Sequence, residues 1–189
     1  MALTPSNMLP LGTVAPSFEL PATDGKRYAL RDFDKAKLLL VMFICNHCPF
    51  VKHVKHELAV LGRDYQQRGV AIVAISSNDI MAYPADDMEH MRAEAAATGF
   101  TFPYLLDENQ QVAKAYDAAC TPDFFLFDQA RKLVYRGQLD GSRPGNNIPV
   151  NGADLRAALE AGLHGREQAS DQKPSVGCNI KWKPGNEPA

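Results

Sequence analysis

The segment from Leu38 to Pro49 has the sequence LLLVMFICNHCP, an apolar run that ends in two closely spaced cysteines. The seven apolar residues include β-branched and aromatic side chains, which is typical of a strand buried on both faces. After Pro49 the apolar residues recur at every third or fourth position, which predicts a helix with one buried face. They are Val51, Val54, Leu58, Leu61 and Tyr65. We therefore expect a central strand that leads directly into an amphipathic helix.

Cys45 and Cys48 lie where this strand gives way to the helix. Unpaired backbone N–H groups and the helix dipole favour a negative charge at that position, and hence a thiolate. A C-x-x-C motif in this setting indicates a thioredoxin-like redox site. We expect Cys45 to be the more exposed sulfur and the attacking one. Cys48, further into the helix, would then resolve the mixed disulfide.

His47, between the two cysteines, is the third candidate catalytic residue. In its protonated form it would lower the pKa of the nearby thiol and make the disulfide more oxidising. A zinc site is the alternative, because His53 and His56 follow the cysteine pair closely enough in sequence to complete four ligands. The helix carries these histidines away from the cysteines along its axis, so the spacing favours redox chemistry and we assign no metal ligand.

The composition is that of an ordinary globular protein. The chain has 189 residues, of which 46% are hydrophobic, enough for one sizeable domain with a core. The 20 basic and 22 acidic residues leave a net charge of −2, which predicts no nucleic-acid or membrane partner. No apolar run approaches the roughly 18 residues of a membrane span. Residues 1–10 lack the basic and apolar regions of a secretory signal, so we expect a cytoplasmic protein.

The rest of the chain alternates strands and helices, which requires right-handed crossovers between parallel strands. One close pair of strands, 124–127 and 133–135, must instead be antiparallel. The pattern predicts an α/β fold with a mixed central sheet flanked by helices and an N-terminal β-hairpin around Asp24-Gly25. We assign residues 1–164 to this domain and residues 165–189 to an irregular C-terminal tail. Further strands are expected over residues 18–20, 28–30, 70–75 and 102–106, and further helices over residues 84–99, 109–116 and 153–163.

Several short segments resemble those of one superfamily. They are Ala15 to Leu20, the Asp24-Gly25 turn, Leu30 to Phe33, Leu106-Asp107, Val112 to Tyr116 and Thr121-Pro122. Together they resemble the thioredoxin superfamily, and more closely its peroxiredoxin-like branch of AhpC/TSA-type redoxins, over residues 12–163. The tail from Pro174 to Trp182 is similar to that of uncharacterised peroxiredoxin-like proteins that also carry Asn-His between the two cysteines.

The resemblance implies a thioredoxin-like fold and a substrate-binding role for Thr121 and Pro122. Pro122 would form a cis peptide bond and face the C-x-x-C motif, while Thr121 would present its backbone to bound substrate. The cis bond is implied by the resemblance alone, and the alternative is an ordinary trans proline that opens an edge strand.

The chain departs from the peroxiredoxin pattern at its reactive cysteine. Peroxiredoxins carry a Thr or Ser three residues before that cysteine and a Pro seven residues before it. Counted back from Cys48, these positions hold Cys45 and Val41; counted back from Cys45, they hold Met42 and Leu38. The segment around the predicted cis-proline also lacks the Arg that peroxiredoxins place there. Dithiol–disulfide exchange needs only the two sulfurs and a docking groove, so it is the favoured activity.

We therefore predict a thiol–disulfide oxidoreductase that uses the Cys45–Cys48 dithiol. The alternatives are a divergent thiol peroxidase and a non-enzymatic copper or zinc carrier that binds through both cysteines and a histidine. No bound cofactor is required, since the electrons would come from an unidentified reductase or a small thiol, and the partners would be protein or small-molecule disulfides and thiols. Cys120 and Cys178 are candidates for extra redox thiols, although Cys120 is more simply a small buried apolar residue.

Overall fold

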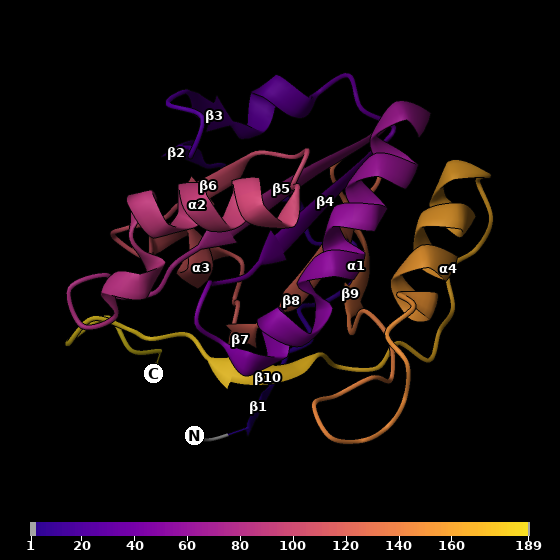
Figure 1. The fold of residues 1–189 in the computed structure, drawn as a ribbon. Coiled ribbons are helices and arrows are strands. Elements are labelled where there is room, and N and C mark those ends of the chain that lie inside the picture. The colour runs from indigo at the N-terminus through magenta and orange to yellow at the C-terminus, as the bar shows by residue number, and fades with distance from the viewer. Residues whose placement is uncertain (1–2, 189) are drawn as a thin grey trace.

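The computed structural model describes residues 3–188, and its centre is a five-stranded sheet with the strand order β6-β5-β4-β8-β9 (Figure 1). β4 lies in the middle, parallel to β5 and antiparallel to β8. β8 and β9 also pair antiparallel, so the predicted mixed sheet is confirmed. The strands of this sheet are β4 Leu38–Phe43, β5 Val70–Ser76, β6 Tyr104–Leu106, β8 Asp123–Phe127 and β9 Leu133–Gly137.

Helices cover both faces of the sheet, as the alternating pattern predicts. The α-helices are α1 Pro49–Tyr65, α2 Met88–Thr98, α3 Gln111–Ala115 and α4 Ala153–Leu163. Three short 3-10 helices are η1 Leu30–Phe33, η2 Gln66–Arg68 and η3 Pro84–Asp86. Side chains of α1, α2 and α4 pack in one core cluster, and side chains of α3 pack in the other. Among residues 3–188 no helix is both long and apolar enough to cross a membrane.

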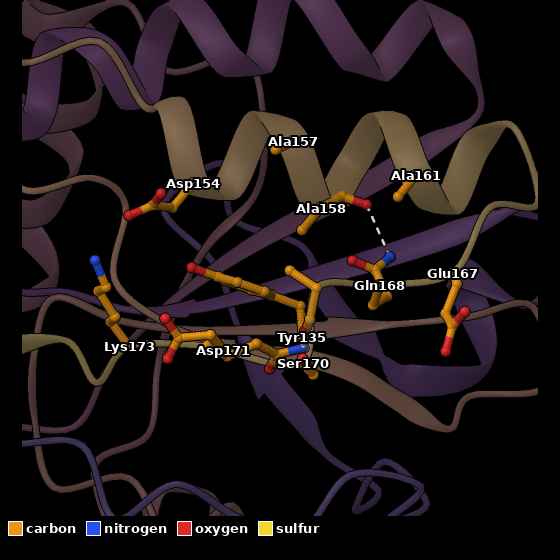
Figure 2. Close-up of a pocket in the computed structure, with 12 residues that line it drawn as sticks. Tyr135, Asp154, Ala157, Ala158, Ala161, Glu167, Gln168, Ser170, Asp171 and Lys173 are labelled. Carbon is orange, nitrogen blue, oxygen red and sulfur yellow. Dashed lines mark hydrogen bonds between the residues drawn. The ribbon is translucent and has the colours of Figure 1, made fainter.

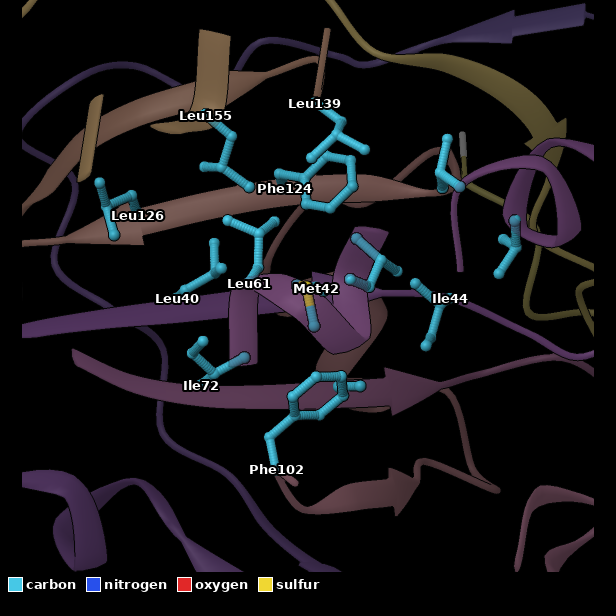
Figure 3. Close-up of a cluster of buried hydrophobic side chains, with 14 of the residues drawn as sticks. Leu40, Met42, Ile44, Leu61, Ile72, Phe102, Phe124, Leu126, Leu139 and Leu155 are labelled. Carbon is cyan, nitrogen blue, oxygen red and sulfur yellow. The ribbon is translucent and has the colours of Figure 1, made fainter. Parts of the chain in front are cut away.

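The strand β4 is buried along its whole length because its alternate side chains enter different cores. Leu40 and Met42 pack with Leu61 of α1 and Leu155 of α4 (Figure 3). Leu39 and its odd-numbered neighbours face the opposite cluster, which includes α3. Each fully buried leucine contributes roughly 1.5–3 kcal/mol to folding. This double packing holds the strand in place and so determines where the cysteine loop leaves the sheet.

The helix α1 begins where the sequence predicts it. Pro49 is its first residue, a position at which the missing backbone N–H costs nothing, and Cys48 is the N-cap. The five apolar residues that define the predicted face are all buried. After α1 the chain forms η2, which is capped by Gly69. The φ of 94° at this residue is accessible to glycine at little cost.

The predicted N-terminal hairpin is also present. β2 Glu19–Pro21 and β3 Arg27–Ala29 pair antiparallel around the Asp24-Gly25 turn. The Asp24 side chain accepts a hydrogen bond from the backbone N–H of Lys26 at 3.0 Å, which closes the turn. In Figure 1 the hairpin lies at the opposite end of the molecule from the chain termini.

Residues 165–188 of the C-terminal segment are more ordered than the predicted irregular tail. Within it, β10 Val176–Asn179 pairs antiparallel with β1 Leu3–Pro5 on one side and with β7 Cys120–Thr121 on the other. This four-residue strand is too short to show an alternating pattern, and both of its partners are distant in sequence, so no local signal reveals it. In Figure 1 it passes beneath the beginning of α1.

Candidate active site

The two cysteines of the motif lie at the junction of β4 and α1, as predicted. Cys45 follows the end of β4, and Cys48 is the N-cap of α1. Their exposed fractions are 2% and 0%, so both cysteines are buried and Cys45 is only marginally the more exposed of the two. Burial follows from the neighbouring segments, which pack over the motif from η3, β7 and β10.

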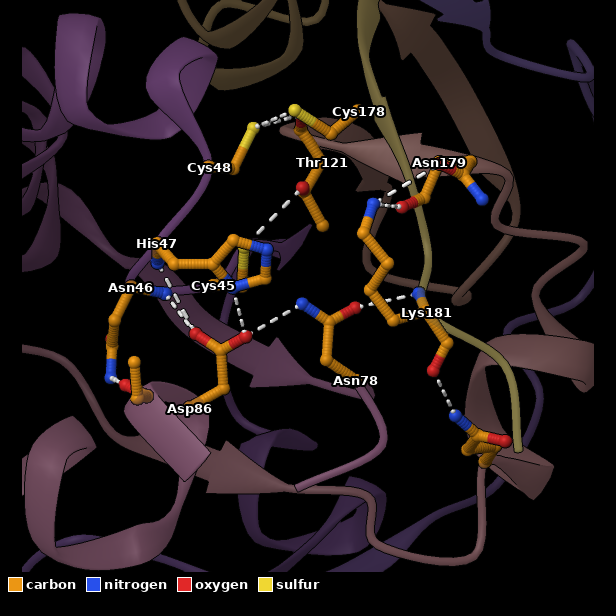
Figure 4. A network of polar contacts seen from close by, with 12 residues as sticks. Cys45, Asn46, His47, Cys48, Asn78, Asp86, Thr121, Cys178, Asn179 and Lys181 are labelled. Atoms are coloured by element: carbon orange, nitrogen blue, oxygen red, sulfur yellow. Dashed lines mark hydrogen bonds and ion pairs between the residues drawn. The ribbon is translucent and has the colours of Figure 1, made fainter. Parts of the chain in front are cut away.

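A buried carboxylate organises the loop between the cysteines (Figure 4). Asp86 of η3 accepts hydrogen bonds from the backbone N–H groups of Asn46 and His47 at 2.7 and 3.2 Å. Its other oxygen lies 2.5 Å from Nδ1 of His47 and 2.8 Å from the side-chain nitrogen of Asn78. Asp86 is 0% exposed, so these contacts compensate the loss of water around its charge. Sequence reasoning missed this role, because the bonded loop lies about 40 residues away.

His47 lies beside Cys45 but is held by other groups. Besides its contact with Asp86, its ring stacks on Tyr83 with a centroid distance of 5.1 Å and an interplanar angle of 8°. The preceding Asn46 is fixed as well, because Tyr104 donates a hydrogen bond to its side-chain oxygen at 3.0 Å. The loop therefore presents its two cysteines from a rigid frame.

The electrostatic environment favours a thiolate at Cys48. A hydrogen bond from the Cys45 thiol lowers the pKa of Cys48 to about 4, and further contacts from Cys178, Thr121 and the backbone N–H of Val51 act in the same direction. Burial opposes this shift. The position at the N-cap agrees with the direction, because unpaired N–H groups and the helix dipole stabilise a negative charge there.

Cys45 has the opposite tendency. Its hydrogen bond to Cys48, its burial and the negative charge of Asp86 all raise its pKa well above the ordinary value. These directions favour a thiolate at Cys48, whereas the sequence predicted the attacking thiolate at Cys45. The physical reason is that α1 begins only at Pro49, so Cys48 alone reaches the helix N-terminus while Cys45 lies beside a carboxylate.

Thr121 and Pro122 face the cysteines, as the family resemblance implies. The Thr121–Pro122 bond is cis. The Thr121 hydroxyl lies 3.5 Å from Sγ of Cys45, and the Thr121 carbonyl oxygen lies 3.3 Å from Sγ of Cys48. A cavity of only about 10 Å³ remains beside Pro122, lined in part by Ser175 and Val176 of the tail. The tail thus fills the space next to the cis-proline.

The two other cysteines have different positions. Sγ of Cys178 lies 2.8 Å from Sγ of Cys48, so the structure brings this candidate redox thiol into the site. Cys120 is 0% exposed, and its thiol contacts the carbonyl oxygen of Pro122 at 3.7 Å. Burial raises the pKa of Cys120, which is the behaviour of an inert core thiol.

A second buried carboxylate, Asp123, follows the cis-proline. One of its oxygens accepts a hydrogen bond from the Ser6 hydroxyl at 2.7 Å, while the other has no hydrogen-bond partner within residues 3–188. Burial raises the pKa of Asp123 to about 7 from an ordinary value of 3.8. Sequence reasoning did not single out this residue, because nothing in the local pattern shows that both of its neighbours are buried.

Asp123 makes folding stability depend on pH. Between about pH 4 and pH 7 the unfolded chain releases the proton while the folded protein keeps it, so the free energy of unfolding falls as the pH rises. The loss is on the order of 4 kcal/mol above pH 7. Asp123→Asn cannot titrate, so its unfolding free energy is expected to lack this decline when measured with urea across the same range. Parallel pH profiles for the two proteins would contradict the raised pKa.

One group of side chains has donor atoms close enough for a metal ion. The ligand atoms of Cys45, His47 and Asp86 all lie within 4.8 Å of one another. A metal ion there would have to separate His47 from Asp86, whose atoms already share a hydrogen bond of 2.5 Å. His53, by contrast, contacts the hydroxyl of Ser142 at 2.7 Å. The existing hydrogen bonds therefore compete with metal binding at this group.

A well-formed cavity lies away from the cysteines (Figure 2). It has a volume of about 710 Å³ between α4 and the segment 167–173. Tyr135, Asp154 and Lys173 are among its lining residues, which include none of the predicted site residues. The candidate active site is thus a packed dithiol centre and not an open pocket.

Comparison with known proteins shows that the chain is related to thiol–disulfide oxidoreductases. The chain is 31% identical over 123 residues to the thiol-disulfide oxidoreductase ResA of Bacillus subtilis, a match that covers 65% of this chain and 64% of that protein. A second ResA, from Geobacillus thermodenitrificans, is 28% identical over 130 residues, with coverages of 69% and 70%. The chain is therefore a distant homologue of thiol–disulfide oxidoreductases.

Two solved structures are similar over almost the whole chain. One is an uncharacterized conserved protein from Geobacillus kaustophilus, with 57% identity, a TM-score of 0.96 and 98% coverage of both chains. The other is a hypothetical protein from Sinorhizobium meliloti, with 52% identity, a TM-score of 0.95 and coverages of 96% and 100%. The model of the AhpC/TSA family matches residues 11–136, about two thirds of the sequence. With this match and the thioredoxin-like fold around its dithiol, the chain belongs to the AhpC/TSA family of the thioredoxin superfamily.

Proposed function

We propose that the protein is a thiol–disulfide oxidoreductase that works through the Cys45–Cys48 dithiol. The observation that carries the proposal is the position of Cys48 at the N-cap of α1, where unpaired N–H groups and the adjacent Cys45 thiol favour a thiolate. The distant homology to ResA supports the same chemistry. Both sulfurs also face Thr121, the residue before the cis-proline.

The proposed reaction begins at Cys48. Its thiolate attacks one sulfur of a substrate disulfide, so that a mixed disulfide forms and the first substrate thiolate leaves. The Cys45 thiol gives its proton to that leaving group, and the Cys45 sulfur then attacks Sγ of Cys48 and expels the second substrate thiolate. The substrate has gained two electrons and the protein holds a Cys45–Cys48 disulfide. The reverse sequence oxidises a substrate dithiol.

This chemistry requires no resident cofactor. The proposed partners are disulfides and thiols of proteins or small molecules, and a reductase or small thiol that returns the protein to its dithiol form. Because Cys48 is 0% exposed, a protein substrate reaches it only after the covering segments move. Thr121 and Pro122, which contact the dithiol, are the proposed substrate-positioning residues.

The first test is the reduction potential of the dithiol, measured in a glutathione redox series with thiol trapping and mass analysis. A thiolate with a pKa of about 4 stabilises the reduced form, so we expect a potential nearer about −120 mV than the thioredoxin value of about −270 mV. A protein that never forms the Cys45–Cys48 disulfide in this series would refute the proposed function.

His47 is proposed to tune this potential. Its ring nitrogen shares a hydrogen bond with Asp86, the carboxylate whose charge disfavours a thiolate at Cys45. His47→Gln keeps a polar side chain but removes the ring, and the reduction potential is expected to fall by about 30 mV, equivalent to about 1.4 kcal/mol. An unchanged potential in the same glutathione series would leave His47 with only a packing role against Tyr83.

A thiol peroxidase is the second candidate. The observation in its favour is that the Cys48 thiolate has a donor, the Cys45 thiol, three residues before it. Consumption of hydrogen peroxide with dithiothreitol as the reductant tests it. Turnover that disappears in Cys48→Ser would support a peroxidase, whereas no turnover by the wild-type protein would remove this candidate.

A further inference from the structure

The strand β10 brings a third thiol against the dithiol. In its register with β7, Cys178 stands opposite Thr121, whose carbonyl oxygen contacts Cys48 and whose hydroxyl contacts Cys45. Sγ of Cys178 lies 2.8 Å from Sγ of Cys48 (Figure 4), and both residues are buried. An S–S bond of about 2.05 Å would require the two atoms to approach by only about 0.8 Å.

The strand is fixed on both sides of Cys178. Before it, the Ser175 hydroxyl donates a hydrogen bond to the carbonyl oxygen of Pro122 at 2.6 Å. After it, the backbone N–H of Lys181 donates to the side-chain oxygen of Asn78 at 2.8 Å, and Asn78 in turn contacts Asp86. The third thiol and the cysteine loop are therefore anchored to the same frame.

Gly177 allows β10 to come this close. A Cβ atom at this position would lie 1.9 Å from the carbonyl oxygen of Thr121, and an approach under 3.0 Å is one that real Cβ atoms essentially never make. Any larger residue would thus push the strand away from β7 by about 1 Å. The position of Cys178 against Cys48 depends on this glycine.

We propose that Cys178 is a third redox thiol that exchanges with the Cys45–Cys48 disulfide and forms a Cys48–Cys178 disulfide. The sulfur of Cys178 attacks Sγ of Cys48, the Cys45–Cys48 bond breaks, and the proton lost by Cys178 passes to Cys45. One disulfide replaces another, so no further oxidant is consumed. The inference rests on the proposed function for the first disulfide. Its product ties β10 to the start of α1 and leaves Cys45 as a thiol.

The charge of Cys48 controls when this exchange can occur. Burial raises the pKa of Cys178 to about 12, and the hydrogen bond and charge of Cys48 contribute to the rise. When Cys48 enters a disulfide, its charge disappears, while Lys181 and the backbone N–H of Phe50 continue to lower the Cys178 pKa. Cys178 is therefore a protonated donor to the reduced dithiol and a better nucleophile toward the oxidised one.

The test uses the full-length Cys45→Ser protein, in which Cys45 can no longer compete for Cys48. The protein is treated with oxidised glutathione, quenched in acid, alkylated and mapped by mass spectrometry without reduction. We expect the Cys48–Cys178 peptide to be the main product. A stable Cys48–glutathione adduct with an alkylated Cys178 would overturn the proposal.

Three further proteins separate this proposal from the proposed function. Gly177→Ala keeps all the thiols but displaces β10, and a displacement of about 1 Å is expected to slow formation of the Cys48–Cys178 bond by up to about 100-fold. Cys120→Ala should give the wild-type map. Cys178→Ser should still form the Cys45–Cys48 disulfide. If Cys178→Ser forms the Cys45–Cys48 disulfide but Cys45→Ser forms no Cys48–Cys178 bond, only the role of Cys178 as a third redox thiol is refuted. If Cys178→Ser does not form the Cys45–Cys48 disulfide, the proposed function fails.

Discussion

Replacing Cys48 with Ser is expected to remove the thiol that has the low pKa, and with it the thiolate present at neutral pH, and to abolish disulfide exchange. The pKa of Cys48 is lowered to about 4, so this sulfur is ionised at neutral pH. Cys45, the remaining motif thiol, keeps its burial and the nearby charge of Asp86, both of which raise its pKa. Even a free thiol with a pKa of about 8.5 is only about 3% ionised at pH 7, so the thiolate population of the motif falls at least about 30-fold.

The measurement is the ultraviolet absorbance of the thiolate as a function of pH, together with turnover of a model disulfide. Cys45→Ser is the matched control, because the serine hydroxyl can still donate to Cys48 and should preserve most of its thiolate. That variant is expected to form mixed disulfides but not to release them through Cys45. If the thiolate absorbance instead disappears in Cys45→Ser and persists in Cys48→Ser, then Cys45 is the attacking residue.

The fold could be predicted because its main signals are local. The apolar run of β4 and the three-to-four spacing along α1 each depend on residues that are neighbours in sequence, and the structure confirms both. The same holds for the turn at Asp24-Gly25. The cis bond at Pro122 has no local signal, and only the family resemblance pointed to it.

The candidate site could be predicted only in part, because its geometry depends on contacts between distant segments. The motif indicated a thiolate, but the choice between its two sulfurs depends on where α1 begins and on the carboxylate that approaches Cys45. That carboxylate, Asp86, lies about 40 residues from the loop that it binds. The contact between Cys48 and Cys178 spans 130 residues and depends on a strand of four residues.

The C-terminal tail packs against the dithiol site and so limits how a substrate reaches Cys48. Strand β10 pairs with the residue before the cis-proline, and its first residue Val176, together with the preceding Ser175, fills the space beside that proline. A substrate for Cys48 must therefore compete with a segment of the same chain. The reactivity of the dithiol toward large and small disulfides is accordingly expected to depend on how firmly β10 is held, which links the stability of the tail to function.

Removal of the Asp86 carboxylate is expected to have the largest effect on stability. In Asp86→Ala four donors lose their acceptor: the backbone N–H groups of Asn46 and His47, the ring of His47 and the side chain of Asn78. Buried donors without partners cost about 1–3 kcal/mol each when no water reaches them. Because some of these groups can turn toward solvent, we expect a total loss of about 3–5 kcal/mol in the free energy of unfolding, measured with urea.

Asp86→Asn separates the hydrogen bonds of the two Asp86 carboxylate oxygens. The amide keeps one oxygen for the backbone N–H groups of Asn46 and His47, but its NH2 group faces the donors of His47 and Asn78. We therefore expect about half of the stability loss of the alanine variant, with the cysteine loop still in place. The thiolate titration of Cys48 should shift less in Asp86→Asn than in Asp86→Ala. An alanine variant that loses under about 1 kcal/mol and keeps the wild-type titration would show that the loop holds its shape without the carboxylate.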